Sequence, residues 1–592
     1  MFAKVLVANR GEIAVRIFRT LRDMGIASVA VYSEVDRAAL HPRFADEAFA
    51  LGGSTSAESY LVADRVLEAA RRSGAEAIHP GYGFLAENAG FAAAVEDAGL
   101  VWIGPPPAAI EVMGSKTVAR RTMQAAGVPI IPGTTEAVAS AAEVVALGDE
   151  LGYPLLLKAA AGGGGKGMKV VRSPDEAEQA LESARREGHA YFADGAVYVE
   201  RYLEDPRHVE VQVLADSHGN VVHLGERDCT IQRRHQKLIE ETPSPAVDEE
   251  LRSRIGAIAV EAARAAGYRS AGTIEGLLTG EGSYYFMEMN TRIQVEHTVT
   301  EVVSGVDIVR AQVQIAAGEK LQFAQSEIRL QGHAIECRIN AEDPTQAFQP
   351  SPGRITLYRE PSGPGVRVDS GVETGSEVSA LYDPMIAKLI VRGVDREDAI
   401  GRMLRALGEF RIDGVKTLIG FHRALLSHPC FRAGGTCEGV VESNELAKAA
   451  DQLSHETTRL TRVSDGGPLS VLATEVEVDG RRVELKVLAP EPAYRALAQR
   501  RRERAAGAAT GPGSGTVRSP MQGTVIDVKV AVGDTISAGA VVCIVEAMKM
   551  ENEITAHRGG VVAELAVSVG MAVSIGQAIC AIDADGSPPA YG

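Results

Sequence analysis

The chain has 592 residues and a formal net charge of −17, and this length corresponds to about four domains of ~150 residues each. The negative charge argues against nucleic-acid and anionic-membrane partners, although a local site could still bind a nucleotide. Six scattered cysteines without a CxxC pair favour a reducing compartment over disulfides or structural zinc. No apolar stretch is long enough to span a bilayer, and a strand pattern begins at Lys4, which leaves no room for a signal peptide. A cytoplasmic protein is therefore expected, with a processed organelle protein as the alternative.

The first 115 residues alternate between strand and helix patterns. Residues 5–8 are apolar, residues 12–24 are amphipathic, and residues 28–32 are apolar again. This βαβ order predicts a parallel sheet. The loops at residues 79–83 and 104–107 follow strands, and open parallel sheets bind ligands at such loops.

Residues 116–203 form a smaller unit that carries a glycine-rich turn. The sequence GGGGKG at residues 162–167 matches GxGxxG, but a strand follows it instead of the helix that a dinucleotide site requires. It is not a phosphate-binding P-loop either, because position 160 is alanine and Gly167 follows the lysine. A glycine-rich turn between two strands can instead cover phosphates as a lid, with its backbone N–H groups as donors. The alternative is a flexible hairpin without chemical use.

Residues 204–446 contain a period-two pattern of polar side chains, which are Glu288, Asn290, Arg292, Gln294 and Glu296. In a strand all five side chains would face the same side. Burying so many polar groups costs free energy unless a metal, a substrate or bonds among the five side chains compensate. Glu288 and Asn290, with Glu275 on the preceding strand, offer the oxygen ligands that Mg²⁺ prefers. Arg292 can bind a small planar anion, and Glu296 is a candidate base. A solvated sheet face is the alternative.

A second cluster covers residues 226–237, where cations gather in an otherwise acidic protein. It predicts a local anion site, and a solvated face is again the alternative. From about residue 447 to 515 the chain turns polar and linker-like. Residues 474–478 and 481–488 flank Asp479-Gly480 and predict a hairpin. Residues 507–515 suit a flexible tether, and residues 585–592 a disordered tail.

Residues 516–584 repeat themselves around Lys549. At a constant offset, Gly523, Gly533, Gly539 and Cys543 recur as Gly560, Gly570, Gly576 and Cys580. Both halves alternate apolar and polar residues, which predicts strands punctuated by glycine turns. We expect two copies of a four-strand unit to pack face to face as a small, all-β flattened barrel. Lys549 would project from the hairpin that joins them, although an ordinary surface lysine is the alternative.

The segment EAMKM at residues 546–550 resembles the lysine hairpin of biotinyl/lipoyl carrier domains, in the biotinyl form. This resemblance implies biotin attached covalently to Lys549 by a biotin protein ligase. The segments ANRGEIA, HPGYGFL, QRRHQK, EMNTRIQV and RINAEDP, which begin at residues 8, 79, 232, 288 and 338, resemble biotin carboxylase, an ATP-grasp enzyme. Fused on one chain, the two parts resemble the α subunit of bacterial acyl-CoA carboxylases of the acetyl- or propionyl-CoA type.

The resemblance implies a multidomain α/β fold followed by an all-β biotinyl barrel. The implied domains are an N-terminal α/β domain (1–115), an ATP-grasp lid (116–203), a catalytic domain (204–446), a linker with a subunit-docking hairpin (447–515), the biotin carboxyl carrier domain (516–584) and a tail (585–592). No segment is left for a carboxyltransferase, so a separate β subunit is expected to complete the reaction. A homo-oligomer within a hetero-oligomer is also implied.

The resemblance assigns the site residues as follows. ATP would be contacted by Lys116, Lys158, Gly164, Gly165, Glu200, Arg201, Leu203, His208, Gln232, His235, Glu275 and Glu288. Two Mg²⁺ or Mn²⁺ ions would be held by Glu275, Glu288 and Asn290. Bicarbonate would be bound by Lys237, Arg292, Arg338 and the backbone of Val295. The catalytic groups would be Lys237, Arg292, Glu296 and Arg338.

In the implied mechanism, Glu296 deprotonates bicarbonate, which attacks the γ-phosphate of ATP to form carboxyphosphate. This intermediate releases CO₂, and its phosphate takes the proton from biotin N1′. Arg338 faces the ureido oxygen and stabilises the enolate, and N1′ captures the CO₂ to give carboxybiotin on Lys549. Metals and cations would neutralise the charge that develops on phosphate.

Two positions depart from the family pattern, since Arg201 stands where many relatives have lysine and Thr298 where many have proline. Neither removes a catalytic group. The acceptor could also be methylcrotonyl-CoA, pyruvate or urea, because its site would lie on the partner subunit. A non-catalytic biotin carrier is the alternative of another class, and the intact set of charged residues argues against it.

Overall fold

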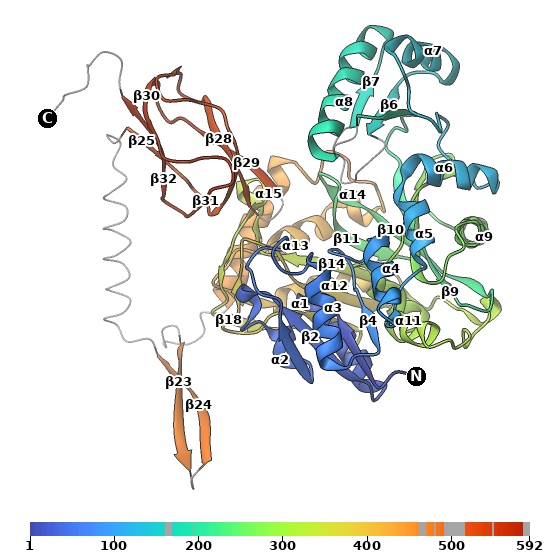
Figure 1. Ribbon diagram of the computed structural model, residues 1–592, viewed down its shortest axis with the longest axis horizontal. Helices are drawn as coiled ribbons and strands as arrows, with labels where there is room; N and C mark the ends of the chain where they lie inside the picture. Colours follow the sequence, from blue (N-terminus) through green and yellow to red (C-terminus); the bar gives the residue numbers. More distant parts are fainter. Residues whose placement is uncertain are drawn as a thin grey trace, which may run out of the picture. The chain divides into compact units, whose positions relative to one another are not determined.

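The computed structural model describes residues 1–159, 168–192, 195–460, 469–478, 481–490, 515–547 and 550–583. It divides into two compact units, Met1–Ser454 and His455–Gly592 (Figure 1). Gly164, Gly165 and Lys549 lie outside the described residues, as do the expected tether (507–514) and tail. Among the helices that are described, none is both long enough and apolar enough to cross a membrane.

Unit 1 begins with a five-stranded parallel sheet in the order β3-β2-β1-β4-β5. Its strands are β1 (Lys4–Val7), β2 (Ala27–Tyr32), β3 (Glu47–Ala50), β4 (Ala77–His79) and β5 (Val101–Trp102). Its helices are α1 (Gly11–Asp23), α2 (Leu40–Phe44), α3 (Ala63–Ser73), α4 (Ala89–Asp97) and α5 (Pro107–Gly114). Helix α1 buries Ile13, Ile17 and Leu21 against Val5 and Val7 of β1, because apolar residues three and four apart share one helix face. The predicted parallel sheet is confirmed.

The next part of unit 1 is a small antiparallel sheet in the order β7-β6-β8, on which helices pack. Its elements are α6 (Lys116–Ala125), α7 (Ala141–Leu151), β6 (Leu155–Ala159), β7 (Met168–Val171), α8 (Ala177–Phe192) and β8 (Val197–Arg201). Leu155 and Val199 of the sheet pack with Val144 of α7 and Leu181 of α8. The glycine-rich turn lies outside the described residues, but the two strands that flank it are as predicted.

An eight-stranded antiparallel sheet forms the largest part of unit 1, in the order β13-β12-β9-β10-β11-β14-β21-β19. Its strands are β9 (Arg207–Ala215), β10 (Val221–Arg233), β11 (Gln236–Thr242), β12 (Ser270–Leu278), β13 (Tyr284–Asn290), β14 (His333–Asn340), β19 (Val366–Ser370) and β21 (Met385–Gly393). Shorter pairs are formed by β15 (Glu342–Asp343), β16 (Gln349–Pro350), β17 (Gly353–Arg354), β18 (Leu357–Arg359), β20 (Glu377–Val378) and β22 (Arg411–Asp413). The helices are α9 (Glu249–Ala265), α10 (His297–Ser304), α11 (Ile308–Ala316), α12 (Arg396–Glu409), α13 (Ile419–Ser427), α14 (Pro429–Arg432) and α15 (Asn444–Leu460). Helix α15 continues past residue 447, where the sequence predicted the linker to begin.

A buried carboxyl group next to this sheet makes the stability of unit 1 depend on pH. Glu342 is only 2% exposed, and this burial raises its pKa to about 7. A single hydrogen bond from Asn340, at 3.4 Å, lowers the pKa only in part. The folded state therefore keeps a proton that the unfolded chain loses near pH 4.5, and stability falls as pH rises through this window. We expect Glu342→Gln to stabilise unit 1 by on the order of 2–3 kcal/mol at pH 8 and by little at pH 5. Denaturant unfolding at both pH values measures this, and an equal effect at the two would contradict it.

The described part of unit 2 contains a hairpin and a small barrel. The hairpin consists of β23 (Leu469–Val478) and β24 (Arg481–Pro490), which are antiparallel with Val478 paired to Arg481, as predicted. The barrel strands are β25 (Thr516–Arg518), β26 (Gly523–Val528), β27 (Thr535–Ile536), β28 (Val541–Ala547), β29 (Met550–Thr555), β30 (Gly560–Leu565), β31 (Ala572–Val573) and β32 (Ala578–Asp583).

The two repeat copies of the barrel interleave instead of forming one sheet each. One sheet has the order β25-β32-β30-β27 and the other β29-β28-β26-β31, so each sheet takes two strands from each copy. The repeated Cys543 and Cys580 are both buried in the shared core. Gly523 and Gly560 repeat because a Cβ at either position would collide with a carbonyl oxygen of the paired strand. The all-β barrel is confirmed, but our expectation that one copy packs against the other is wrong.

Candidate active site

The polar residues predicted to line one strand instead lie on a strand end and the loop that follows it. Strand β13 ends at Asn290, residues 291–296 form the loop, and α10 begins at His297. The His297 ring and backbone N–H both contact the Gln294 carbonyl, at 2.7 and 3.4 Å, and turn the chain into the helix. The prediction of a single strand over residues 288–296 is therefore wrong beyond Asn290. We call residues 291–296 the active-site loop.

Lys237 lies at the centre of the site, between three carboxylates from separate parts of the chain. Its Nζ donates to Glu210 Oε2 at 2.6 Å, Glu275 Oε1 at 2.8 Å and Glu296 Oε1 at 2.7 Å. Strands β11, β9 and β12 and the active-site loop supply these four residues. Burial alone would lower the pKa of Lys237, but the three carboxylates raise it well above its usual value. The ammonium group is therefore charged and has all three N–H groups bonded.

Each of the three carboxylates also has a cation of its own. Glu210 Oε1 accepts from Arg227 at 2.6 Å. Glu275 Oε2 lies 3.1 Å from His208 Nε2, and Glu296 Oε2 accepts from Arg338 at 2.9 Å. Burial would lower the pKa of His208, but Glu275 raises it above its usual value. Lys237, Arg227 and Arg338 are thus concentrated in one small part of the molecule, and such a cluster of cations suits an anionic substrate.

Glu240 is the further carboxyl group next to Arg338, whose Nε donates to its Oε1 at 2.6 Å. Burial raises the pKa of Glu240 to about 7. Burial would also raise the pKa of Glu296, but Lys237 and Arg338 lower it well below its usual range. Two carboxyl groups on one arginine are thus held in different states, with Glu296 ionised and Glu240 close to its titration point at neutral pH.

The predicted metal ligands fit a divalent cation. Glu275 and Glu288 are paired across β12 and β13, and both are largely buried. Burial and the charge of Glu275 raise the pKa of Glu288, whereas Lys237 and His208 lower that of Glu275. One of the two facing carboxyls is thus driven towards its neutral form by burial and by the charge of the other. A hard divalent ion between them would favour the charged form of both, and Asn290 Oδ1, which is bonded to Arg292 Nη2 at 2.8 Å, would be a third oxygen ligand.

The predicted ATP contacts converge only in part. Lys158 on β6 lies 2.5 Å from Glu200 on β8, and Gln232 Nε2 lies 3.1 Å from His208 Nδ1. Lys116 is half-buried at the start of α6, where burial lowers its pKa and Glu288 opposes this. The tight β10–β11 turn, in which His235 has a φ of 64°, brings Gln232 opposite Lys237. Arg201 is exposed at the end of β8, and Leu203 is half-buried in the segment that follows.

The predicted bicarbonate residues lie around the active-site loop. Arg292 donates from Nε to Glu87 Oε2 at 3.0 Å, and the Val295 carbonyl accepts from Lys388 Nζ at 2.6 Å. Thr298, the departure from proline, donates its hydroxyl to the buried carboxyl of Glu336. Sequence reasoning assigned no individual role to several residues that hold the site together, namely Glu87, Glu210, Arg227, Glu240 and Lys388. Arg227 lies within the predicted cationic cluster at residues 226–237, but no motif marked it or the other four as site residues.

Comparisons with known proteins agree with this arrangement. Four family models match the chain: "Biotin carboxylase, N-terminal domain" over residues 1–110, "Carbamoyl-phosphate synthase L chain, ATP binding domain" over 115–324, "Biotin carboxylase C-terminal domain" over 336–443 and "Biotin-requiring enzyme" over 515–582.

Among curated proteins, the chain is 49% identical over 583 residues to the biotin-dependent acyl-coenzyme A carboxylase alpha3 subunit of Mycobacterium leprae, which covers 95% of either chain. It is 55% identical over 434 residues to a pyruvate carboxylase subunit of Methanothermobacter thermautotrophicus, covering 73% of this chain and 88% of that one.

Two solved structures resemble unit 1. The Campylobacter jejuni biotin carboxylase in complex with beta-gamma-ATP has 47% identity and a TM-score of 0.72, and covers 74% of this chain and 99% of that chain. The biotin carboxylase domain of the Hydrogenobacter thermophilus 2-oxoglutarate carboxylase, with MgADP and bicarbonate, has the same identity and TM-score and covers 75% and 99%. The identity with the Mycobacterium leprae protein extends along nearly its whole length, and both biotin carboxylase models and the biotinyl model match, so this chain belongs to the biotin carboxylases of the ATP-grasp type, in the form fused to a biotin carrier domain.

Proposed function

We propose that the chain uses ATP and bicarbonate to carboxylate biotin held covalently on its own Lys549, and that a separate carboxyltransferase subunit transfers the carboxyl group to an acyl-CoA such as acetyl-CoA or propionyl-CoA. The observation that carries this proposal is the Lys237 centre, a cluster of cations and carboxylates on a chain that also contains a biotinyl domain. A biotin protein ligase would attach the biotin.

Metal ions bound with ATP would be held by Glu275, Glu288 and Asn290, and they would neutralise the charge on the phosphates during transfer. The chain's own cations support the same step. Lys158 and Lys116 would contact phosphate oxygens, while Gln232, His208 and His235 would lie along the nucleotide.

Glu296 is proposed to take the proton of bicarbonate, and its partners explain how a weak base can do so. Lys237 and Arg338 keep its pKa low in the free protein. The same two cations, with Arg292, are proposed to bind bicarbonate. When they turn towards this anion, Glu296 loses part of its stabilisation as a carboxylate and its pKa rises. The base would thus become stronger only when its substrate is present.

The experiment that tests the function is ADP release by the purified chain with free biotin, with and without bicarbonate. Lys549→Ala should leave this release unchanged, because free biotin replaces the attached group, and should eliminate acyl-CoA carboxylation in the presence of the carboxyltransferase. Acyl transfer that survives in the variant would refute the carrier role of Lys549. ADP release at the same rate with and without bicarbonate would refute the proposed biotin carboxylase activity.

The acceptor is proposed to be an acyl-CoA because the relative with 49% identity along the chain is an acyl-CoA carboxylase subunit. Pyruvate or another acyl-CoA is the alternative, since a pyruvate carboxylase subunit is also similar over unit 1. Capture of the biotinylated chain on avidin, with mass spectrometry of what co-purifies and assay of its acceptor preference, distinguishes them.

The β23–β24 hairpin is the proposed docking element for the carboxyltransferase subunit. Among the strands that the structure describes, β23 and β24 pair only with each other. Within the described residues, no strand pairs with their outer edges, and a partner can use such edges to extend a sheet. Deleting residues 474–488 should weaken capture of the carboxyltransferase while free-biotin carboxylation remains. Undiminished capture would show that docking occurs elsewhere.

A further inference from the structure

Two fully buried cations contact consecutive residues of the active-site loop. Among the described residues, Arg227 and Lys388 are the lysine or arginine side chains with 0% exposure. Arg227 Nη2 donates to Gln294 Oε1 at 2.6 Å, and Lys388 Nζ donates to the Val295 carbonyl at 2.6 Å. Neither cation belongs to the residue set that the sequence motifs assign to ATP, metal, bicarbonate or biotin.

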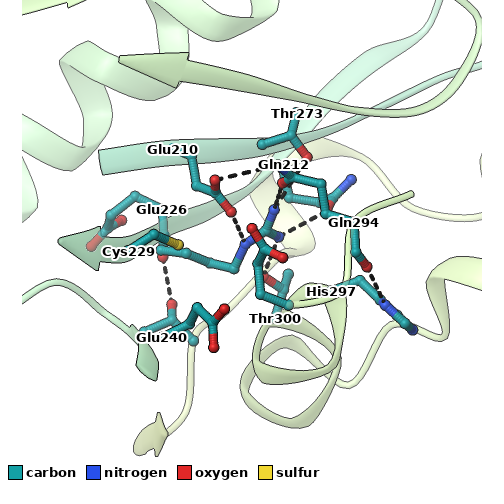
Figure 2. Close-up of polar contacts among 12 residues, drawn as sticks. Glu210, Gln212, Glu226, Cys229, Glu240, Thr273, Gln294, His297 and Thr300 are labelled. Carbon is teal, nitrogen blue, oxygen red and sulfur yellow. Dashed lines mark hydrogen bonds and ion pairs between the residues drawn. The ribbon is translucent and has the colours of Figure 1, made fainter. Parts of the chain in front are cut away.

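Arg227 uses every donor that a guanidinium has. Its five N–H groups match five acceptors, which Figure 2 shows converging from several elements: Glu210 Oε1 (2.6 Å), Gln212 Oε1 (2.8 Å), Thr300 Oγ1 (3.0 Å), Thr273 Oγ1 (3.1 Å) and Gln294 Oε1 (2.6 Å). Burial opposes its charge, but Glu210 and Glu296 raise its pKa. A planar fork with five fixed directions is thereby locked in one orientation, which lysine cannot reproduce.

The locked guanidinium decides how two neighbouring side chains face the site. Because Gln294 gives its oxygen to Arg227, its Nε2 points to Glu275 Oε1, at 2.7 Å. Because Glu210 gives Oε1 to Arg227, its Oε2 is left for Lys237, at 2.6 Å. One arginine therefore sets the amide orientation of Gln294 and one of the three carboxylates on the central lysine.

Lys388 holds the backbone of the loop at the residue after Gln294. The Val295 carbonyl belongs to the peptide group that joins Val295 to Glu296. The hydrogen bond from Lys388 therefore fixes the orientation of this peptide group, and with it the direction of the Glu296 side chain. Lys388 also lies 3.5 Å from Glu12 Oε1, and Glu12 accepts from the Tyr82 hydroxyl. The loop is thus tied to α1 and to the loop after β4 in the N-terminal sheet.

We propose that Arg227 and Lys388 are positioning residues for the bicarbonate step. They hold the active-site loop so that Glu296 and Lys237 are correctly placed to contact the substrate. The inference rests on the proposed function and adds two residues to it. A buried ion pair by itself adds little stability over an apolar replacement. The directed bonds to Gln294 and Val295 therefore point to orientation as the role of these cations.

A control of similar chemistry lies on the same strand as Arg227. Glu226 precedes it on β10, so the two side chains point to opposite faces of the sheet. Glu226 is buried and accepts from Arg252 of α9 at 2.8 and 2.9 Å, away from the active-site loop. Arg252→Met should therefore lower thermal stability without changing either Michaelis constant.

The test compares Arg227→Lys, Lys388→Gln and Arg252→Met with the wild type in full-length enzyme, by free-biotin-dependent ADP release at varied bicarbonate and varied ATP. We expect Arg227→Lys and Lys388→Gln to raise the KM for bicarbonate and to lower kcat, each by about tenfold or more. The reason is that a shift of about 1 Å in the position of a reacting group is enough to lower the rate by about 10²-fold. The KM for ATP should stay within about twofold. Arg252→Met should keep all three constants.

The proposal also predicts coupling between Arg227 and Gln294. Since Arg227 acts partly through Gln294, Arg227→Lys combined with Gln294→Met should cost clearly less than the sum of the two single changes. Additive losses would overturn the inference, and so would folded Arg227→Lys or Lys388→Gln enzyme with wild-type constants. If one variant does not fold, the other still decides. Wild-type turnover tests the proposed function, whereas the ratio of variant to wild type tests the positioning role.

Discussion

Replacing Glu296 by glutamine is expected to lower the kcat of bicarbonate-dependent ADP release by about 10³-fold or more, near the upper range for loss of a general base. The amide keeps the volume of the side chain and one oxygen that can still accept from Lys237 or Arg338. It cannot accept the proton of bicarbonate, however. Because the carboxylates that are proposed to face the metal and ATP are unchanged, nucleotide binding should persist.

Single-turnover ADP release and titration with MgATP measure these two quantities separately. Glu226→Gln is the matched control, since Glu226 is equally buried and paired to arginine but lies on the other face of β10. A Glu296→Gln enzyme that turns over at the wild-type rate would show that another group takes the proton. Loss of nucleotide binding in this variant would instead mean that Glu296 organises the whole site.

Replacing Lys237 by methionine is expected to have the second large effect, on stability as well as activity. Three buried carboxylates would lose their common cation, and leaving a buried ion pair without one partner costs about 3–5 kcal/mol. The raised pKa of Lys237 means that its contribution is complete below about pH 10 and is lost above it. The lowered pKa values of Glu275 and Glu296 mean that their contribution is lost below about pH 4.5.

The stability deficit of Lys237→Met should therefore be largest between about pH 5 and 10 and should shrink in acid. Denaturant unfolding across this range measures it. Lys4→Met is the control, because its pair with Glu47 is partly exposed and exposed pairs contribute about 0–1 kcal/mol. A deficit that does not change with pH would mean that lost packing, and not the three carboxylates, explains the effect.

Periodicity and glycine spacing predicted the architecture well because these signals are local. The parallel sheet of unit 1 follows from βαβ order, and the carrier barrel follows from its repeat. The interleaving of the two copies was not predictable, since alternation shows which residues face inward but not which strand each one pairs with. The period of two over residues 288–296 was misread for a related reason. Gln294 is polar because it lies in a turn and is bonded to Arg227 and Glu275. In the sequence, such a position looks the same as a polar position on the exposed face of a strand.

Motifs predicted the residues that are proposed to touch substrate, but they did not single out the two cations that are proposed to orient them. Lys237 and Glu296 stand in long, recognisable segments. Arg227 stands within β10, and Lys388 lies in the apolar strand β21, where a lone lysine is read as a surface residue. Their roles arise from strands far apart in the chain that become neighbours only in the folded sheet. Although Arg227 falls in the predicted cationic cluster at residues 226–237, nothing in the sequence shows which side chains these two cations contact.

The interleaved barrel has a consequence for how the protein is made. Strand β25 pairs with β32, with Val517 opposite Cys580, so the first strand of the carrier has its partner only after the ribosome has completed the last one. Neither repeat copy can close a core alone, so a ligase proposed to act on Lys549 would meet no folded domain on an unfinished chain. Biotin on the chain would then indicate that translation reached the end of the domain. Products broken off earlier would remain unlabelled and could not compete for the carboxyltransferase as charged carriers.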